Sequence, residues 1–169
     1  MQRISFSKAI GAAAEQLSEG AFLISGDKAN PMTVGWATFG VVWGKPICTV
    51  FVRHSRYSHE LMEKKSTFTL SVPEKGAMKA ELGICGRLSG RDVDKLTEAN
   101  MSVMSNENGG QLLSGCKFHF VCKTVAKTEL DMNQIDESIL DRFYNTNQAT
   151  EDGDPHTVYF AEIIETYES

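Results

Sequence analysis

The residues Ile47-Cys48-Thr49-Val50-Phe51-Val52 form a nearly continuous apolar run between the turn Gly44-Lys45-Pro46 and the polar segment that starts at Arg53. A short run rich in β-branched and aromatic residues, bounded by turn residues, is typical of a β-strand. Because apolar residues occupy successive positions, we expect both faces of this strand to be buried, as in a small closed barrel. The run therefore favours a mainly β fold.

Further strands and a few short helices are expected around this run. Apolar patterning between turn residues predicts strands at 21–25, 32–42, 66–72, 112–127 (interrupted near Gly115) and 156–167. Weaker helical patterning predicts helices at 4–17, 57–65, 74–84, 91–98 and 135–143. Many strands with few helices favour a β-barrel with helical insertions over a doubly wound sheet. The run Gly-x-Gly-x-x-Gly is absent, which weighs against a classical dinucleotide fold.

Composition sets limits on location and partners. At 169 residues, the chain is expected to form a single domain over residues 1–169. The net charge of −5 argues against a nucleic-acid or anionic membrane surface, and no apolar run is long enough to span a bilayer. No histidine–carboxylate cluster has metal spacing, so no metal site is expected. A cytoplasmic protein with reduced, buried thiols is expected, because none of the cysteines shows zinc-finger or CxxC spacing: Cys48, Cys85, Cys116, Cys122.

The segment Arg53-His54-Ser55-Arg56-Tyr57-Ser58-His59-Glu60 follows the central strand and begins a predicted helix. With Ser55 as the expected N-cap, the positive end of the helix favours an anion, and Arg56 adds a fork of donors suited to phosphate. Ser55 and Ser58 contribute hydroxyl groups, and Arg53 lies close enough to point to the same place. The alternative is an ordinary capped helix with solvated arginines.

The segment Asn30-Pro31-Met32-Thr33-Val34-Gly35-Trp36 offers groups that suit a planar heterocycle. The Asn30 amide both donates and accepts hydrogen bonds, Thr33 adds a hydroxyl, and Trp36 provides a flat apolar wall. Read separately, Asn30 is also consistent with a turn residue and Trp36 with a core residue. Together with the downstream anion site, the segment predicts a pocket for an aromatic molecule that carries a phosphate.

Several segments in this order resemble one known family. The segment from Asn30 to Trp36, the strand from Pro46 to Val52 and the pattern Arg53-x-Ser55-x-x-Ser58-x-Glu60-Leu61 resemble flavin reductase-like proteins with an FMN-binding split barrel. The stretch from Leu82 to Leu96 is similar to that family's helix–loop–helix. Asp152-Gly153-Asp154-Pro155-His156 is similar to its acidic-His segment before the last strand, although the usual order there is Gly-Asp-His. The resemblance is strongest to flavoredoxin-like members.

The resemblance implies a homodimeric FMN-binding split barrel and a set of flavin contacts. Asn30, Thr33 and Trp36, with Met32 in the same segment, would line the ring and ribityl chain. Arg53, Ser55, Arg56 and Ser58 would hold the phosphate. Ser89, Gly90 and Lys95 would close the pocket, and His156 would lie by the flavin or at the dimer edge. FMN would lie near the subunit interface.

Two function classes follow from the resemblance. The first is an FMN-dependent oxidoreductase that takes hydride from NAD(P)H and passes electrons to free flavin, a metal complex or a protein acceptor. The second is an FMN-binding electron carrier or sensor without nicotinamide turnover. A third alternative is a split barrel that has lost flavin and binds another group such as haem. No catalytic dyad is evident, which fits chemistry carried by the flavin.

Overall fold

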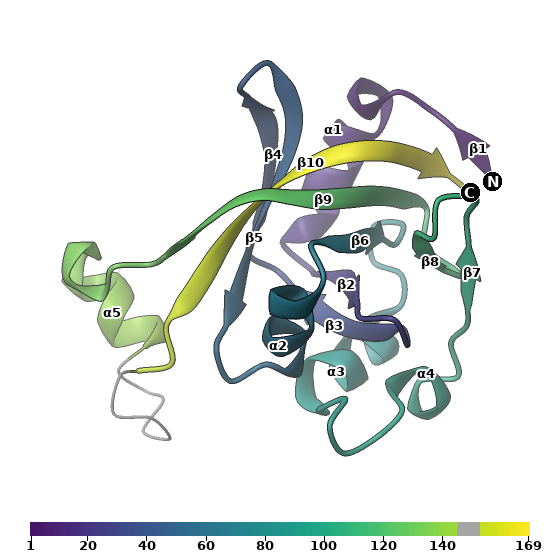
Figure 1. Ribbon diagram of the computed structural model, residues 1–169. Helices are drawn as coiled ribbons and strands as arrows, with labels where there is room; N and C mark the ends of the chain where they lie inside the picture. Colours follow the sequence, from purple (N-terminus) through teal and green to yellow (C-terminus); the bar gives the residue numbers. More distant parts are fainter. Residues whose placement is uncertain (145–152) are drawn as a thin grey trace.

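The computed structural model describes residues 1–144 and 153–169 (Figure 1). Its elements in chain order are β1 (Gln2–Arg3), α1 (Phe6–Leu17), β2 (Ala21–Ser25), β3 (Asn30–Val34), β4 (Ala37–Val42), β5 (Lys45–Arg53), α2 (Tyr57–Lys64), β6 (Thr67–Val72), α3 (Lys79–Arg87), α4 (Lys95–Glu98), β7 (Val103–Ser105), β8 (Gln111–Leu113), β9 (Phe118–Glu129), the 3₁₀ turn η1 (Met132–Gln134), α5 (Glu137–Phe143) and β10 (His156–Glu168). Asp152, which begins the expected acidic-His segment, lies outside the described residues.

One antiparallel sheet dominates the fold. Its strands follow the order β3-β2-β6-β9-β10-β5-β4, β1 pairs with β10, and β7 and β8 form a separate small sheet. The long strand β10 is central, because it pairs with β9 on one side and β5 on the other. Buried side chains from β2, β3, β5, β6, β9 and β10 meet in one core, which the sheet surrounds. The predicted mainly β fold with helical insertions is confirmed.

Helices α1 and α3 belong to two apolar clusters that contain alternate residues of β2. Helix α1 buries Ala9, Ala13 and Leu17 against the main core. On the other face of β2, Phe22 and Ile24 belong to a second apolar cluster that includes residues of α3. All five residues of β2 are consequently buried. This second cluster fixes α3, and the loop after it, beside the amino-terminal end of β3.

The predicted strand over residues 32–42 is two strands. β3 pairs with β2, whereas β4 pairs with β5 at the opposite end of the sheet. The chain changes strand partners at Gly35 and Trp36, where the Trp36 carbonyl accepts a bond from Phe51 N at 3.0 Å. The apolar alternation continues through the break, so the pattern alone could not locate it.

The helices predicted over 74–84 and 91–98 begin later than expected. Gly76 and Met78 have φ of +78° and +55°, values that a right-handed helix excludes, so α3 starts at Lys79. Asp94 accepts bonds from Leu96 N and Thr97 N as the N-cap of α4, which therefore starts at Lys95. The strand predicted over 112–127 is β8 and β9, separated by a turn with Gly115 at φ +89°.

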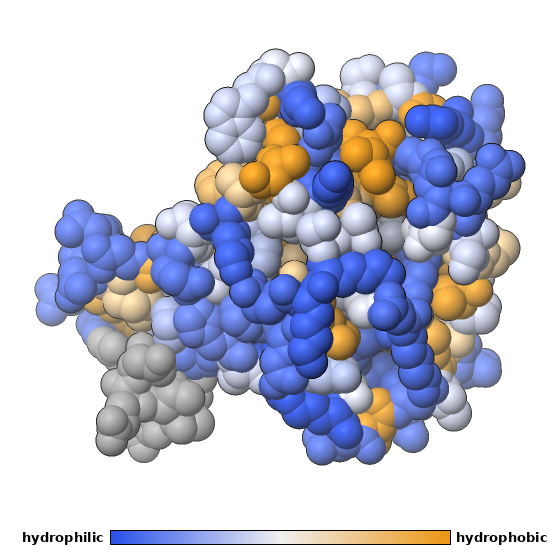
Figure 2. All heavy atoms as spheres, viewed as in Figure 1, coloured by the Kyte–Doolittle hydropathy of each residue, from blue (hydrophilic) through white to orange (hydrophobic). Residues whose placement is uncertain are grey.

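The surface in Figure 2 is largely hydrophilic, with hydrophobic patches over the upper strands of that view. No helix in the described part of the chain is long and apolar enough to cross a bilayer. Over residues 1–144 and 153–169, no three His, Cys, Asp or Glu side chains are arranged to hold a metal ion. All four cysteines are buried and unpaired.

Candidate functional site

The turn between β5 and α2 carries most of the polar residues that the sequence predicts for a phosphate site. β5 ends at Arg53, and Arg56 is the N-cap of α2, with no side chain capping the helix. The prediction of Ser55 as the cap is therefore wrong. Its backbone N–H and hydroxyl instead donate to the Asp154 carboxylate at 2.9 and 2.6 Å. The positive end of α2 thus lacks a side-chain acceptor in the described part of the chain.

A cavity of about 120 Å³ opens beside this turn. Its walls come from β3, the β5–α2 turn, the end of α3, the loop after it and the first residue of α4. The lining residues are Met32, Ser55, Arg56, Tyr57, Ser58, Arg87, Leu88, Ser89, Gly90, Arg91 and Lys95. Four of these side chains are cationic and none is acidic, so the cavity is suited to an anion.

Arg56 lies half-buried in this cavity and is held in place from two sides. Its Nη2 donates to the Gly86 carbonyl at 2.8 Å, and its Nε contacts the Met32 sulfur at 3.4 Å. Burial is the main cause that lowers the pKa of its guanidinium. These contacts fix the plane of the guanidinium while leaving other N–H groups for a ligand.

Lys95 is the most unusual cation of the site, because it is only 4% exposed. Burial lowers the pKa of its amine to about 8, and nearby Arg56 lowers it further, while Cys85 acts in the opposite direction. No carboxylate among the described residues forms an ion pair with it. Asp94, its neighbour in sequence, pairs with Lys28 at 3.0 Å and caps α4. Buried lysines are rare without a partner, and an anion in the cavity would supply one.

A second cavity of about 420 Å³ adjoins the first and shares Tyr57, Gly90, Arg91 and Lys95 with it. Asn30 lines this larger cavity, and its Nδ2 donates to Ser58 Oγ at 3.0 Å. A Cβ at Gly90 would lie 2.0 Å from Asn30 Oδ1, so only glycine fits there without a shift. Gly90 therefore lets the loop after α3 pass directly over Asn30 between the two cavities.

Thr33 holds α3 in place and does not line either cavity. Its hydroxyl donates to the Leu82 carbonyl at 2.6 Å, and Gly86 passes close above its side chain. This bond ties β3 to α3. The bond fixes the loop that carries Ser89 and Gly90.

An aromatic group forms near the start of β10. The Trp36 ring stacks on His156 with ring centres 4.6 Å apart, and Tyr144 hydroxyl lies 2.8 Å from His156 Nδ1. Arg53 donates to the Phe143 and Asp154 carbonyls at 2.6 and 2.9 Å. Burial, then the charge of Arg53, lowers the pKa of His156 to about 4, so its imidazole is neutral at physiological pH. Arg53 thus anchors the segment before β10 to the end of β5.

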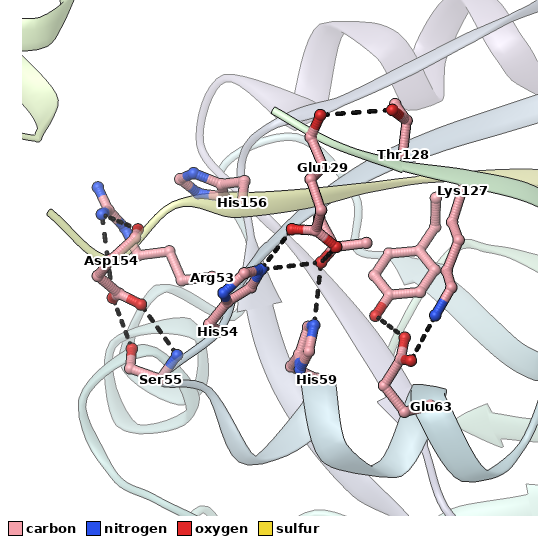
Figure 3. Close-up of polar contacts among 12 residues, drawn as sticks. Arg53, His54, Ser55, His59, Glu63, Lys127, Thr128, Glu129, Asp154 and His156 are labelled. Carbon is pink, nitrogen blue, oxygen red and sulfur yellow. Dashed lines mark hydrogen bonds and ion pairs between the residues drawn. The ribbon is translucent and has the colours of Figure 1, made fainter. Parts of the chain in front are cut away.

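His54 of the turn and His59 of α2 face β9 and β10, as Figure 3 shows. His54 Nε2 lies 2.6 Å from Glu129 Oε2, and both His54 and His59 lie within 3.1 Å of the Thr157 hydroxyl. Thr157 donates to Glu129 Oε1 at 2.8 Å. Together with the Asp154 contacts to Ser55, this network holds the turn from both of its sides.

Comparison with known families identifies the chain. The family described as flavin reductase like domain matches residues 14–168. The chain belongs to this family. The match spans most of the described sheet and places the chain among flavin-dependent oxidoreductases.

Solved structures share the fold of this flavin reductase-like chain. Flavoredoxin from Methanosarcina acetivorans is 23% identical, with 89% of this chain and 68% of that chain covered and a TM-score of 0.66. An FMN-binding protein from Thermus thermophilus is 18% identical, with coverage of 88% and 69% and a TM-score of 0.66. An NADH:FAD oxidoreductase from Streptomyces globisporus is 20% identical, with coverage of 89% and 75% and a TM-score of 0.65. The expected split-barrel fold is confirmed.

A curated relative of unknown function comes from Archaeoglobus fulgidus. It is 25% identical over 109 residues, a match that covers 63% of this chain. The same match spans only 60% of that protein's length.

The residues expected from the family resemblance separate into two groups. Seven line the small cavity: Met32, Ser55, Arg56, Ser58, Ser89, Gly90 and Lys95. Asn30 lines the adjoining larger cavity, and Thr33 supports α3 beneath it. Trp36, Arg53 and His156 instead contact one another near the start of β10.

Arg87, Arg91 and Asp154 lie in segments that resemble the family, but the sequence gave them no individual role. The two arginines flank the Leu88-Ser89-Gly90 loop. Their positive charges on both sides of a predicted pocket loop could have indicated that they line the pocket. Arg91 also donates to the Ser55 carbonyl at 3.0 Å and forms an ion pair with Glu60. Asp154 lies 99 positions from Ser55 in sequence, and no local pattern connects them.

Proposed function

We propose that this protein is an FMN-dependent oxidoreductase of the flavin reductase type. The single observation that carries the proposal is Lys95, which is 4% exposed, lines the cavity with Arg56 and pairs with no carboxylate in the described residues. A phosphate group fits this donor set, since it supplies the missing negative charge and accepts several hydrogen bonds. The family membership and the FMN-binding structural neighbours support FMN as the phosphate-bearing group.

In this proposal the phosphate lies in the small cavity. Arg56 and Lys95 hold its charge, Ser58 and Ser89 contribute hydroxyl groups, and the uncapped start of α2 adds its positive end. Arg53 and Ser55 are proposed to keep the turn in shape from behind, because Asp154 already occupies their donors. The flavin body would extend toward the larger cavity past Asn30.

Bound flavin supplies the redox chemistry by accepting and releasing electrons, and the protein binds and orients it. We propose NAD(P)H as the hydride donor, and free flavin, a metal complex or a protein as the acceptor. Support for the donor comes from the similarity in fold to an NADH:FAD oxidoreductase. A cytoplasmic homodimer with Trp36 and His156 near the flavin of either subunit is part of the same proposal.

The test is anaerobic addition of NADH or NADPH to the purified protein after reconstitution with FMN. Rapid bleaching of the flavin absorbance is expected. If the spectrum stays unchanged with both nucleotides, the reductase proposal fails and the electron-carrier alternative replaces it. A protein that stays colourless after reconstitution with FMN would contradict the flavin site itself.

A further inference from the structure

Lys95 has a chemical property that binding a phosphate does not use. An uncharged lysine amine attacks aldehydes, whereas ordinary lysines are almost wholly protonated near neutral pH. Burial favours the uncharged form of Lys95, with a pKa of about 8 in place of the usual 10.5. At pH 7 the uncharged fraction is then on the order of a hundredfold larger than for an ordinary lysine.

The groups around Lys95 leave this amine without a counter-ion. Cys85 lies within electrostatic range, but burial raises the pKa of its thiol to about 11, so the thiol is neutral at physiological pH. Asp94 is engaged by Lys28 and by the first N–H groups of α4. Arg56 is itself a cation and disfavours a second positive charge. Cys85 offsets this shift only in part, so at pH 7 roughly a tenth of the Lys95 amine is uncharged and the rest is ammonium.

The position of Lys95 suits a ligand that has a phosphate at one end and a reactive group at the other. Lys95 lines both cavities, the small one with Arg56 and Ser58 and the larger one with Asn30. A phosphate bound in the small cavity would leave the rest of a small ligand beside the Lys95 side chain. The larger cavity, about 420 Å³, has room for a single substituted ring.

We propose that Lys95 is a Schiff-base site for small phosphorylated aldehydes. The amine nitrogen adds to the carbonyl carbon, and the resulting carbinolamine loses water to give the imine. Hydrolysis with one water returns both partners, so the step needs no oxidant or reductant. One part of this proposal rests on the proposed function: such aldehydes should compete with FMN for the Arg56 side of the pocket.

The probe is pyridoxal 5′-phosphate, added to the flavin-free full-length protein and trapped with borohydride. Intact mass should show one reduced pyridoxyl phosphate per chain, and peptide mapping should place it on Lys95. Pyridoxal, which lacks the phosphate, should label Lys95 at least about tenfold more slowly, because one charge-assisted anchor is lost. Inorganic phosphate should protect Lys95 from the probe.

Two variants sharpen the test. Lys95→Arg keeps the positive charge but removes the nucleophile, so labelling of that peptide should disappear. Lys28→Arg is the matched control, since Lys28 lines the same larger cavity but its side chain is 80% exposed; labelling of Lys95 should persist. Thermal unfolding of both variants checks that each is folded.

Labelling spread over exposed lysines, or equal rates for pyridoxal and its phosphate, would overturn the proposal. If phosphate protects Lys95 and FMN does not, the Schiff-base site stands and the FMN proposal fails. If FMN binds tightly but the probe never labels Lys95, the Schiff-base proposal fails and the FMN proposal stands.

Discussion

Replacing Arg56 with alanine removes one cation from the proposed phosphate site without removing the turn that carries it. Arg56 is already fixed by the Gly86 carbonyl at 2.8 Å and the Met32 sulfur, so little side-chain entropy is lost when phosphate binds. A hydrogen bond to a charged group contributes about 1.5–3 kcal/mol. We therefore expect Arg56→Ala to weaken FMN binding by about 2 kcal/mol, or roughly 30-fold in Kd.

The assay is quenching of flavin fluorescence by the wild-type and variant proteins, with FMN and riboflavin titrated in parallel at one salt concentration. Riboflavin lacks the phosphate, so its affinity should change by less than about twofold in Arg56→Ala. Arg56→Lys is the matched variant, because it keeps the charge and loses the planar fork. Its FMN affinity should lie between those of the wild-type protein and Arg56→Ala. Unchanged FMN affinity in Arg56→Ala, or an equal loss for both flavins, would refute the assignment of Arg56 to the phosphate.

Three further changes test other parts of the site. Asp154→Ala leaves the Ser55 N–H and hydroxyl without their buried acceptor, so urea unfolding should show a loss of about 1–3 kcal/mol. Gly90→Ala places a methyl group 2.0 Å from Asn30 Oδ1, so FMN affinity should fall as the loop moves off the cavity, by fluorescence titration. The Lys95 amine loses its proton near pH 8 in the free protein, whereas a phosphate bound beside it keeps the amine protonated. FMN affinity should therefore fall as the pH rises above about 8. Lys95→Met should abolish this pH dependence.

Each of these has an outcome that contradicts it. Unfolding of Asp154→Ala that matches wild type would mean that the Asp154 contacts add nothing to the turn. Gly83→Ala is the control for Gly90→Ala, because a Cβ in that helical position meets nothing within 4 Å; equal FMN affinities in the two glycine variants would exclude the close-packing argument. A pH slope retained in Lys95→Met would assign the titration to another group.

The general fold was predictable because the strongest local sequence patterns correspond to elements of the structure. The apolar run of β5 and the turn residues around it predicted a barrel strand, and β5 pairs directly with the central strand β10. The division of residues 32–42 was not predictable, since it depends on which distant strands pair with each half. Likewise, the late start of α3 follows from positive φ at Gly76 and Met78, and only the glycine gave a sequence signal.

The candidate site was predictable in its residue types and less so in its partners. Arg56, Ser58 and Lys95 line the cavity as the family resemblance implied. Arg53 and Ser55 belong to the same polar segment, yet their donors are taken by the segment before β10. Only the pairing of β5 with β10 brings these groups together, and that pairing joins residues about 100 positions apart. A local pattern identifies donors, whereas the tertiary fold decides which acceptor each donor receives.

In the proposed function, the pocket of Arg56 and Lys95 holds flavin through its phosphate. The measurement that tests it most directly is the ratio of FMN to riboflavin affinity for the wild-type protein, obtained by fluorescence titration at pH 7. Two charge-assisted contacts to the phosphate predict that FMN binds at least about a hundredfold more tightly. Equal affinities for FMN and riboflavin would contradict a phosphate-binding role for this pocket.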